Sequence, residues 1–98
     1  MDTLYERLKE KGVGERIAKT ASEIGMILKD SPDGCILIDI IKDLEFKNAK
    51  VFKNEGKYAP LFVLNTIKVL EINGLVEMQT NGSYRLTTKG RDCYDFSD

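Results

Sequence analysis

Apolar side chains recur every three or four positions in four stretches of the chain, which is the spacing of a single helix face. In the third stretch Ile36, Ile38 and Ile40 also alternate, so that a strand is an alternative there. The pattern therefore predicts four helices, with that one ambiguity. They cover residues 2–11, 15–29, 37–44 and 60–73.

Two segments between these helices lack a helical period. Ser31-Pro32-Asp33-Gly34 predicts a turn, because proline presets φ and Asp-Gly tolerates a tight return. Cys35 and Ile36 then fit a short strand before the third helix. Residues 47–58 are polar and basic, and they either extend the third helix as far as Phe52 or form a loop that ends at Gly56.

The segment after the fourth helix predicts a β-hairpin. Gly74 ends that helix, because glycine adopts the left-handed conformation of a C-terminal cap. Asn81-Gly82 predicts a two-residue type I′ turn, which needs positive φ at both central residues. This turn would place Met78 opposite Arg85. The two expected strands are residues 75–78 and 83–87, and a short helix over 88–96 follows them.

This order of helices and hairpin resembles the small winged helix-turn-helix regulators of bacteria and archaea. Gly-Leu-Val-Glu precedes the expected wing and Tyr-Arg-Leu-Thr-Thr-Lys-Gly-Arg closes it. The resemblance covers residues 15–96 and is most specific between Ile67 and Arg91. It implies one mainly helical α+β domain over residues 1–98 with a C-terminal β-hairpin wing, preceded by a helix and turn at residues 1–14.

The resemblance also implies a function, which is double-stranded DNA binding by a transcriptional regulator of archaeal-like type. In this family the helix before the wing enters the major groove, and the wing contacts the backbone or the minor groove. Many members are homodimers that associate through helices outside the core module. Here the last helix or the first one would take that role, and the first would use Leu4, Tyr5 and Leu8.

Charge is distributed unevenly along the chain, although the formal net charge is only −1. Residues 1–46 hold seven basic and ten acidic side chains, whereas residues 47–91 hold eight basic and three acidic ones. A net charge of +5 therefore falls on the segment that contains the expected wing. Such a local concentration of positive charge favours contact with nucleic acid.

Candidate DNA contacts fall into three groups. A row of lysines and Tyr58 would contact phosphates if the row is helical, with a solvated lysine face as the alternative. The helix before the wing offers an amide for an adenine edge, a methyl group for thymine and one cation. The wing and the residues after it offer cations and one hydroxyl for the backbone. The candidates are Lys47, Lys50, Lys53, Lys57, Tyr58, Asn65, Thr66, Lys68, Ser83, Arg85, Lys89 and Arg91.

A second hypothesis follows from the helix over residues 60–73, which is apolar nearly all round. With Ile67 at the centre of its buried face, apolar residues also fall on or near the opposite side. A helix of this kind is usually buried on all sides. The alternative is therefore a winged-helix protein–protein interaction module without nucleic acid, docking through this outer face. Its interface would include Phe62, Val69 and Ile72.

The sequence offers little for other functions. It has no histidine and no glycine-rich phosphate loop, so we expect no enzyme, catalytic residue or cofactor. Cys35 and Cys93 are too few for a zinc site and are interpreted as free thiols, with a disulfide as the alternative in a hyperthermophile. No run approaches the roughly 18 apolar residues of a membrane span, and the N-terminus lacks a signal-peptide pattern. We expect a cytoplasmic protein without a membrane partner.

Overall fold

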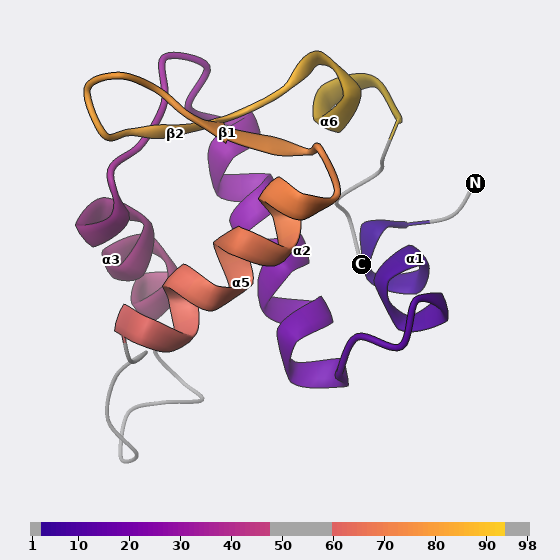
Figure 1. Ribbon diagram of the computed structural model, residues 1–98. Helices are drawn as coiled ribbons and strands as arrows, with labels where there is room; N and C mark the ends of the chain where they lie inside the picture. The colour runs from indigo at the N-terminus through magenta and orange to yellow at the C-terminus, as the bar shows by residue number, and fades with distance from the viewer. Residues whose placement is uncertain (1–2, 48–59, 94–98) are drawn as a thin grey trace.

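The computed structural model describes residues 3–47 and 60–93 of the chain. These residues form a mixed α+β structure that is mostly helical, with a two-stranded antiparallel hairpin after the long helices (Figure 1). The helices are α1 (Leu4–Glu10), α2 (Glu15–Lys29), α3 (Leu37–Lys47), α5 (Pro60–Ile72) and α6 (Thr88–Cys93). The strands are β1 (Val76–Met78) and β2 (Tyr84–Leu86).

Helix α2 lies at the centre of the molecule and packs against α1, α3, α5 and β2. It covers the expected residues 15–29, and its buried face includes Ala18, Ala21, Ile24 and Leu28 at exposed fractions of zero. The spacing of three or four residues places these side chains on one stripe, as the sequence predicted.

Helix α1 packs its apolar side chains into this core. Leu4 and Leu8 are each 1% exposed and belong to the central hydrophobic cluster. Our expectation that they form a dimer interface is therefore wrong, because α2 already covers them. Tyr5 is half-buried, and its hydroxyl donates a hydrogen bond to Glu15 Oε1 at 3.1 Å. The Glu15 carboxylate, as the larger cause, and burial raise the pKa of Tyr5.

The region from residue 31 to residue 47 resolves the ambiguity between helix and strand. The predicted turn is confirmed, since the Gly34 amide donates to the Ser31 carbonyl at 2.9 Å. Cys35 then forms an antiparallel bridge to Tyr84, with amide–carbonyl bonds of 2.8 Å in both directions. Leu37–Lys47 is helical, so the strand alternative for this segment is wrong beyond that bridge.

Helix α5 ends where the sequence predicted. Gly74 has φ of 73°, its amide donates to the Glu71 carbonyl, and the Leu75 amide donates to the Leu70 carbonyl. These two bonds form the Schellman motif that satisfies the last carbonyls of a helix. Since Leu75 is 1% exposed, the chain enters the hairpin with a side chain already in the core.

The hairpin exists, but its turn and its register differ from the prediction. Gly82 has φ of 85°, whereas no non-glycine residue in the described part has positive φ, so a type I′ turn at Asn81-Gly82 is excluded. The Gly82 amide donates to the Gln79 carbonyl at 3.0 Å, and the Gln79 amide donates to the Ser83 carbonyl at 2.7 Å. The loop therefore has three residues, and Arg85 pairs with Glu77 instead of Met78.

Candidate nucleic-acid interface

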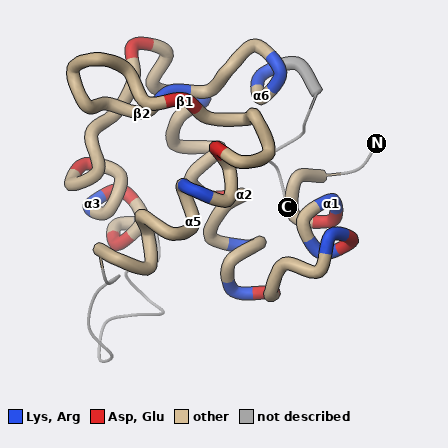
Figure 2. The backbone as a smooth tube through the Cα atoms, viewed as in Figure 1, with Lys and Arg blue, Asp and Glu red and all other residues tan. Residues whose placement is uncertain are grey.

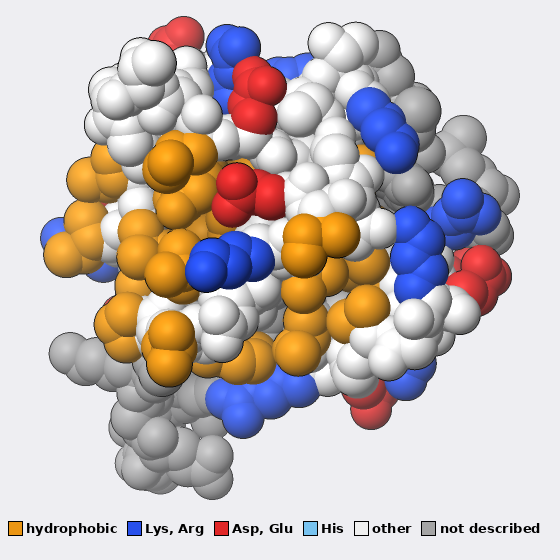
Figure 3. Space-filling model, viewed as in Figure 1, with side chains coloured by type: hydrophobic (Ala, Val, Ile, Leu, Met, Phe, Trp, Pro, Cys, Tyr) orange, Lys and Arg blue, Asp and Glu red, His pale blue; other side chains and the backbone are white. Residues whose placement is uncertain are grey.

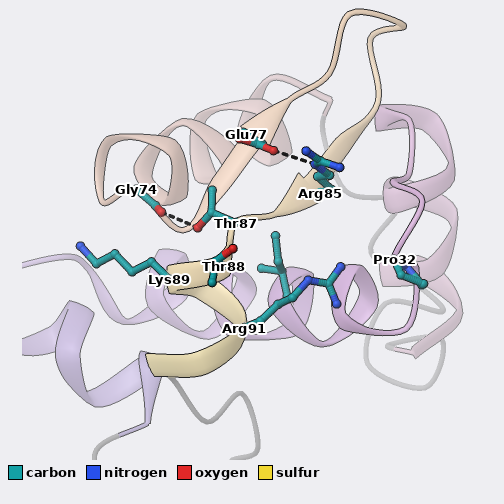
Figure 4. Close-up of a pocket in the computed structure, with 9 residues that line it drawn as sticks. Pro32, Gly74, Glu77, Arg85, Thr87, Thr88, Lys89 and Arg91 are labelled. Atoms are coloured by element: carbon teal, nitrogen blue, oxygen red, sulfur yellow. Dashed lines mark hydrogen bonds and ion pairs between the residues drawn. The ribbon is translucent and has the colours of Figure 1, made fainter.

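The cations predicted for the wing gather around one cleft of about 490 Å³ between the hairpin and α6. Arg85 lines it from β2, and Lys89 and Arg91 line it from α6 (Figure 4). Figure 4 shows the Arg91 side chain extending toward Pro32 and the Lys89 side chain extending the opposite way. The cleft is lined mainly by polar groups, and its lining includes these three cations and one carboxylate.

The carboxylate in the cleft is Glu77, which forms an ion pair with Arg85 across the two strands. The distance from Arg85 Nε to Glu77 Oε1 is 2.6 Å, and both side chains are 46% exposed. Water and salt screen an ion pair at this exposure, so the arginine can exchange it for a phosphate. Glu77 nevertheless reduces the positive charge of this part of the cleft.

Lys89 and Thr87 connect the hairpin and α6 to the end of α5. Lys89 Nζ donates to the Asn73 carbonyl at 3.2 Å, and Thr87 Oγ1 donates to the Gly74 carbonyl at 2.6 Å. Thr87 Oγ1 also accepts the Gly90 amide at 3.1 Å and so caps α6. These bonds hold the cation-bearing helix at a fixed position beside the hairpin.

Two residues predicted to contact DNA from their sequence positions are buried instead. Thr66 is 0% exposed, and its hydroxyl donates to the Phe62 carbonyl at 2.9 Å. Ser83 is 5% exposed, and its hydroxyl donates to Asn81 Oδ1 and accepts from Gln79 Nε2. Neither side chain offers a group to a ligand in solution, and we remove both from the candidate contacts.

The outward face of α5 is less polar than the face of a base-reading helix. Asn65 and Lys68 are exposed there, as predicted. Leu61 and Ile72 on the same helix are 68% and 84% exposed. Lys68 is the single basic residue of α5, and Figure 2 shows how isolated that positive charge is on this helix.

Phe62 and Val69, which the sequence assigned to a partner interface, are half-buried at the edges of this face. The guanidinium carbon of Arg16 lies 4.8 Å from the centroid of the Phe62 ring, within the range of a cation–π contact. Among the three predicted interface residues of α5, Ile72 alone is exposed, at 84%.

The lysine row of the sequence lies largely outside the described residues. Lys47 is the last residue of α3, and its side chain is not described. The remaining predicted contacts of this group are Lys50, Lys53, Lys57 and Tyr58, which fall outside the described residues.

Two residues that sequence reasoning missed, Glu77 and Gln79, shape the site. Glu77 escaped notice because the expected register placed Met78 opposite Arg85, although opposite charges flanking a hairpin turn are a usable signal. Gln79 Nε2 donates to the Asp33 carbonyl and to Ser83 Oγ, both at 2.9 Å. It thereby ties the hairpin loop to the turn before α3, a contact between segments 46 positions apart.

Cys35 is a free thiol in a half-buried position. Burial, followed by the nearby carboxylates of Asp39 and Asp43, raises its pKa. Its reactive thiolate is therefore scarce at neutral pH. Among the described residues no group of three histidine, cysteine or acidic side chains could hold a metal ion.

We expect the Cys35 thiol to be alkylated more slowly by iodoacetamide at pH 7 than a free cysteine. The rate should rise as the pH increases beyond the range where ordinary thiols ionise, because burial and the two carboxylates oppose ionisation. The measurement is a pH series on a Cys93→Ser variant, followed by mass spectrometry. The variant Asp39→Asn/Asp43→Asn should shift the profile to lower pH, and an unchanged profile would contradict the electrostatic part of this account.

No helix in the described part of the chain combines the length and the apolar character needed to cross a membrane. Comparison of the chain with protein-family models, with curated proteins and with solved structures finds no match.

Proposed function

We propose that this chain is a winged-helix protein that binds double-stranded DNA as a transcriptional regulator, mainly through the phosphate backbone. The order α2, α3, α5 and hairpin supports this proposal, since it is the order of a winged helix-turn-helix module. The observation that carries the proposal is that Arg85, Lys89 and Arg91 all line one polar cleft beside the hairpin.

Backbone contact suits the chemistry of this cleft. Arginine binds phosphate oxygens through two parallel N–H donors, and lysine acts as a point charge. The three cations are solvent-exposed, so they can approach a phosphate without a large rearrangement. Contacts of this kind position a protein on DNA and carry no sequence information by themselves.

Base recognition by α5 would be sparse. Sequence is read through hydrogen bonds and methyl contacts at base edges, and α5 offers Asn65 and Lys68 for them. The exposed Leu61 and Ile72 at the two ends of the same face offer no hydrogen-bonding group. We therefore expect weak discrimination between operator and unrelated duplexes by this helix.

A duplex titration tests the proposal. The variant Lys89→Ala/Arg91→Ala should bind a fluorescent duplex at least tenfold more weakly than the wild type at low salt, measured by anisotropy. The slope of log affinity against log salt should become shallower by up to about two units, since each phosphate contact contributes roughly 0.9. Glu77→Gln should strengthen binding, because it releases Arg85 from its ion pair.

The matched control removes the same charge elsewhere. Lys9 and Lys19 are exposed on α1 and α2, and Lys9→Ala/Lys19→Ala should change affinity and salt slope much less. Equal losses of duplex affinity in the two double variants would show that the protein attracts DNA only through non-specific charge. Absence of duplex binding by the wild type at low salt would overturn the proposal.

The protein-interaction module remains the second candidate function. The observation that favours it is the exposure of Leu61 and Ile72, because large apolar side chains at 68% and 84% exposure on one helix face are typical of a contact surface. It assigns α5 to a protein partner and makes no use of the cationic cleft.

A further inference from the structure

The outward face of α5 carries a ridge made of Leu61, Asn65, Lys68 and Ile72. Leu61 and Ile72 are eleven positions apart, close to three helical turns, so they lie on one line along the helix. Asn65 and Lys68 are exposed between them. Figure 3 shows hydrophobic side chains gathered over α3 and α5 on the face in view. The ridge is thus apolar at both ends and polar in the middle.

The ridge can pack against a second copy of itself that runs in the opposite direction. A second α5 laid antiparallel to the first would bring Leu61 against Ile72 of the second copy at each end. In the middle, Asn65 would meet Lys68 of the second copy. Each contact occurs twice about a two-fold axis, as an isologous interface requires.

Charge selects the antiparallel orientation. A parallel pairing in register would place the two Lys68 ammonium groups against each other, and like charges at an interface cost binding energy. In the antiparallel pairing the Lys68 ammonium donates to the Asn65 side-chain oxygen, which is an acceptor. Lys68 at the centre of the ridge therefore has a hydrogen-bond acceptor in the antiparallel orientation and faces a like charge in the parallel one.

The extent of the surface indicates a weak dimer. Helix α5 has 13 residues and is about 20 Å long. A helix pair of this length buries less than the roughly 800 Å² per partner of a stable complex. Helix α3 packs beside α5, and two of its apolar side chains are exposed, Ile38 at 56% and Phe46 at 84%.

We propose that the chain forms a two-fold homodimer in which the α5 ridges of two copies pack antiparallel. This inference goes beyond the proposed DNA binding and does not depend on it. It assigns Asn65 and Lys68 to the dimer interface instead of the major groove. The cations of the hairpin and α6 stay available in each copy, because none of them belongs to the ridge.

Sedimentation velocity over a range of micromolar concentrations tests the association. The dimer fraction of the wild type should rise with concentration, and Ile72→Asp should weaken association at least tenfold by burying a carboxylate at each end. Met78→Asp is the matched control, since Met78 is 60% exposed on β1 and lies outside the ridge. Circular dichroism of both variants should match the wild type, because both positions are exposed.

Cysteine crosslinking tests the orientation. In a Cys35→Ser/Cys93→Ser background, a mixture of the Leu61→Cys and Ile72→Cys variants should form disulfide-linked dimers under mild oxidation. Each variant alone should form few. In the antiparallel dimer the two copies of position 61 are about 16 Å apart along the helix axes alone, whereas a disulfide needs Cα atoms within about 7 Å.

Three results would overturn the proposal. The first is a wild type that stays monomeric at every concentration, including one that uses this face to bind a different protein. The second is a dimer that Ile72→Asp leaves intact. The third is crosslinking within the single-variant samples at the expense of the mixture, which would indicate a parallel dimer. A wild type that dimerises but does not bind duplex DNA would overturn the DNA-binding proposal and leave the dimer proposal standing.

Discussion

Gly90→Ala is expected to lower the free energy of unfolding by about 3 kcal/mol, the upper part of the range for overpacked sites. A Cβ at position 90 would overlap the carbonyl oxygen of Leu75 and lie 3.2 Å from its carbonyl carbon and 3.3 Å from its Cα. These are backbone atoms at the entry to the hairpin, so they cannot move aside as a flexible side chain would. Urea unfolding followed by circular dichroism measures the change.

Gly90→Ala is expected to destabilise the protein, which is the opposite of the usual effect of glycine-to-alanine substitution in a helix. Gly90 lies inside α6, where alanine would otherwise favour the helix by about 1 kcal/mol. The neighbouring Arg91→Ala is the control, since Arg91 is exposed and its truncation should change stability by less than about 0.5 kcal/mol. A Gly90→Ala variant as stable as the wild type would mean that α6 does not pack this closely on Leu75.

Ile67→Ala is expected to lower the free energy of unfolding by about 2–5 kcal/mol. Ile67 is 0% exposed at the centre of the α5 buried face, so truncation loses transfer free energy and leaves a cavity. Ile72→Ala makes the same chemical change on the same helix at a position that is 84% exposed. It should change stability by less than about 0.5 kcal/mol.

The comparison of Ile67→Ala with Ile72→Ala must be made on the monomer. Dimerisation through α5 would make the apparent stability depend on protein concentration, and Ile72→Ala would then act on the dimer. Thermal and urea unfolding should therefore be measured at concentrations where sedimentation shows monomers. Equal destabilisation by the two variants would contradict the burial pattern of α5.

Several elements could be predicted because their signals are local. The residues 15–29 repeat apolar side chains at helical spacing, and α2 spans the same residues. The cap at Gly74 ends α5 through bonds to carbonyls three and four positions before it. Such features depend on a few neighbouring residues, which the sequence displays directly.

The hairpin register could not be predicted from its turn alone. Asn81-Gly82 suggested a two-residue turn, which would have paired Val76 with Thr87. In the structure Val76 pairs with Leu86, and both are 3% exposed. Because a shift of one residue moves every side chain to the other face, burial against the core decides the register.

The candidate site was predicted in part. Arg85, Lys89 and Arg91 line one cleft, since they follow one another closely through the hairpin and α6, and their contact with DNA stays a prediction. Thr66 was misplaced because its polar side chain suggested solvent, although it lies three residues after Val63 and four before Leu70 on the buried face. Its hydroxyl is satisfied within the helix, which removes the cost of burying it.

The sequence by itself determined the span of α2, the glycine that ends α5 and the presence of a hairpin, because hydrophobic period and turn chemistry act over a few residues. Tertiary structure alone decided which apolar faces are covered. It buried Leu4 and Leu8 under α2 and left Leu61 and Ile72 open to solvent, although all four are apolar residues on predicted helices. The physical reason is that burial depends on which elements meet in space, and a one-dimensional pattern does not contain that information.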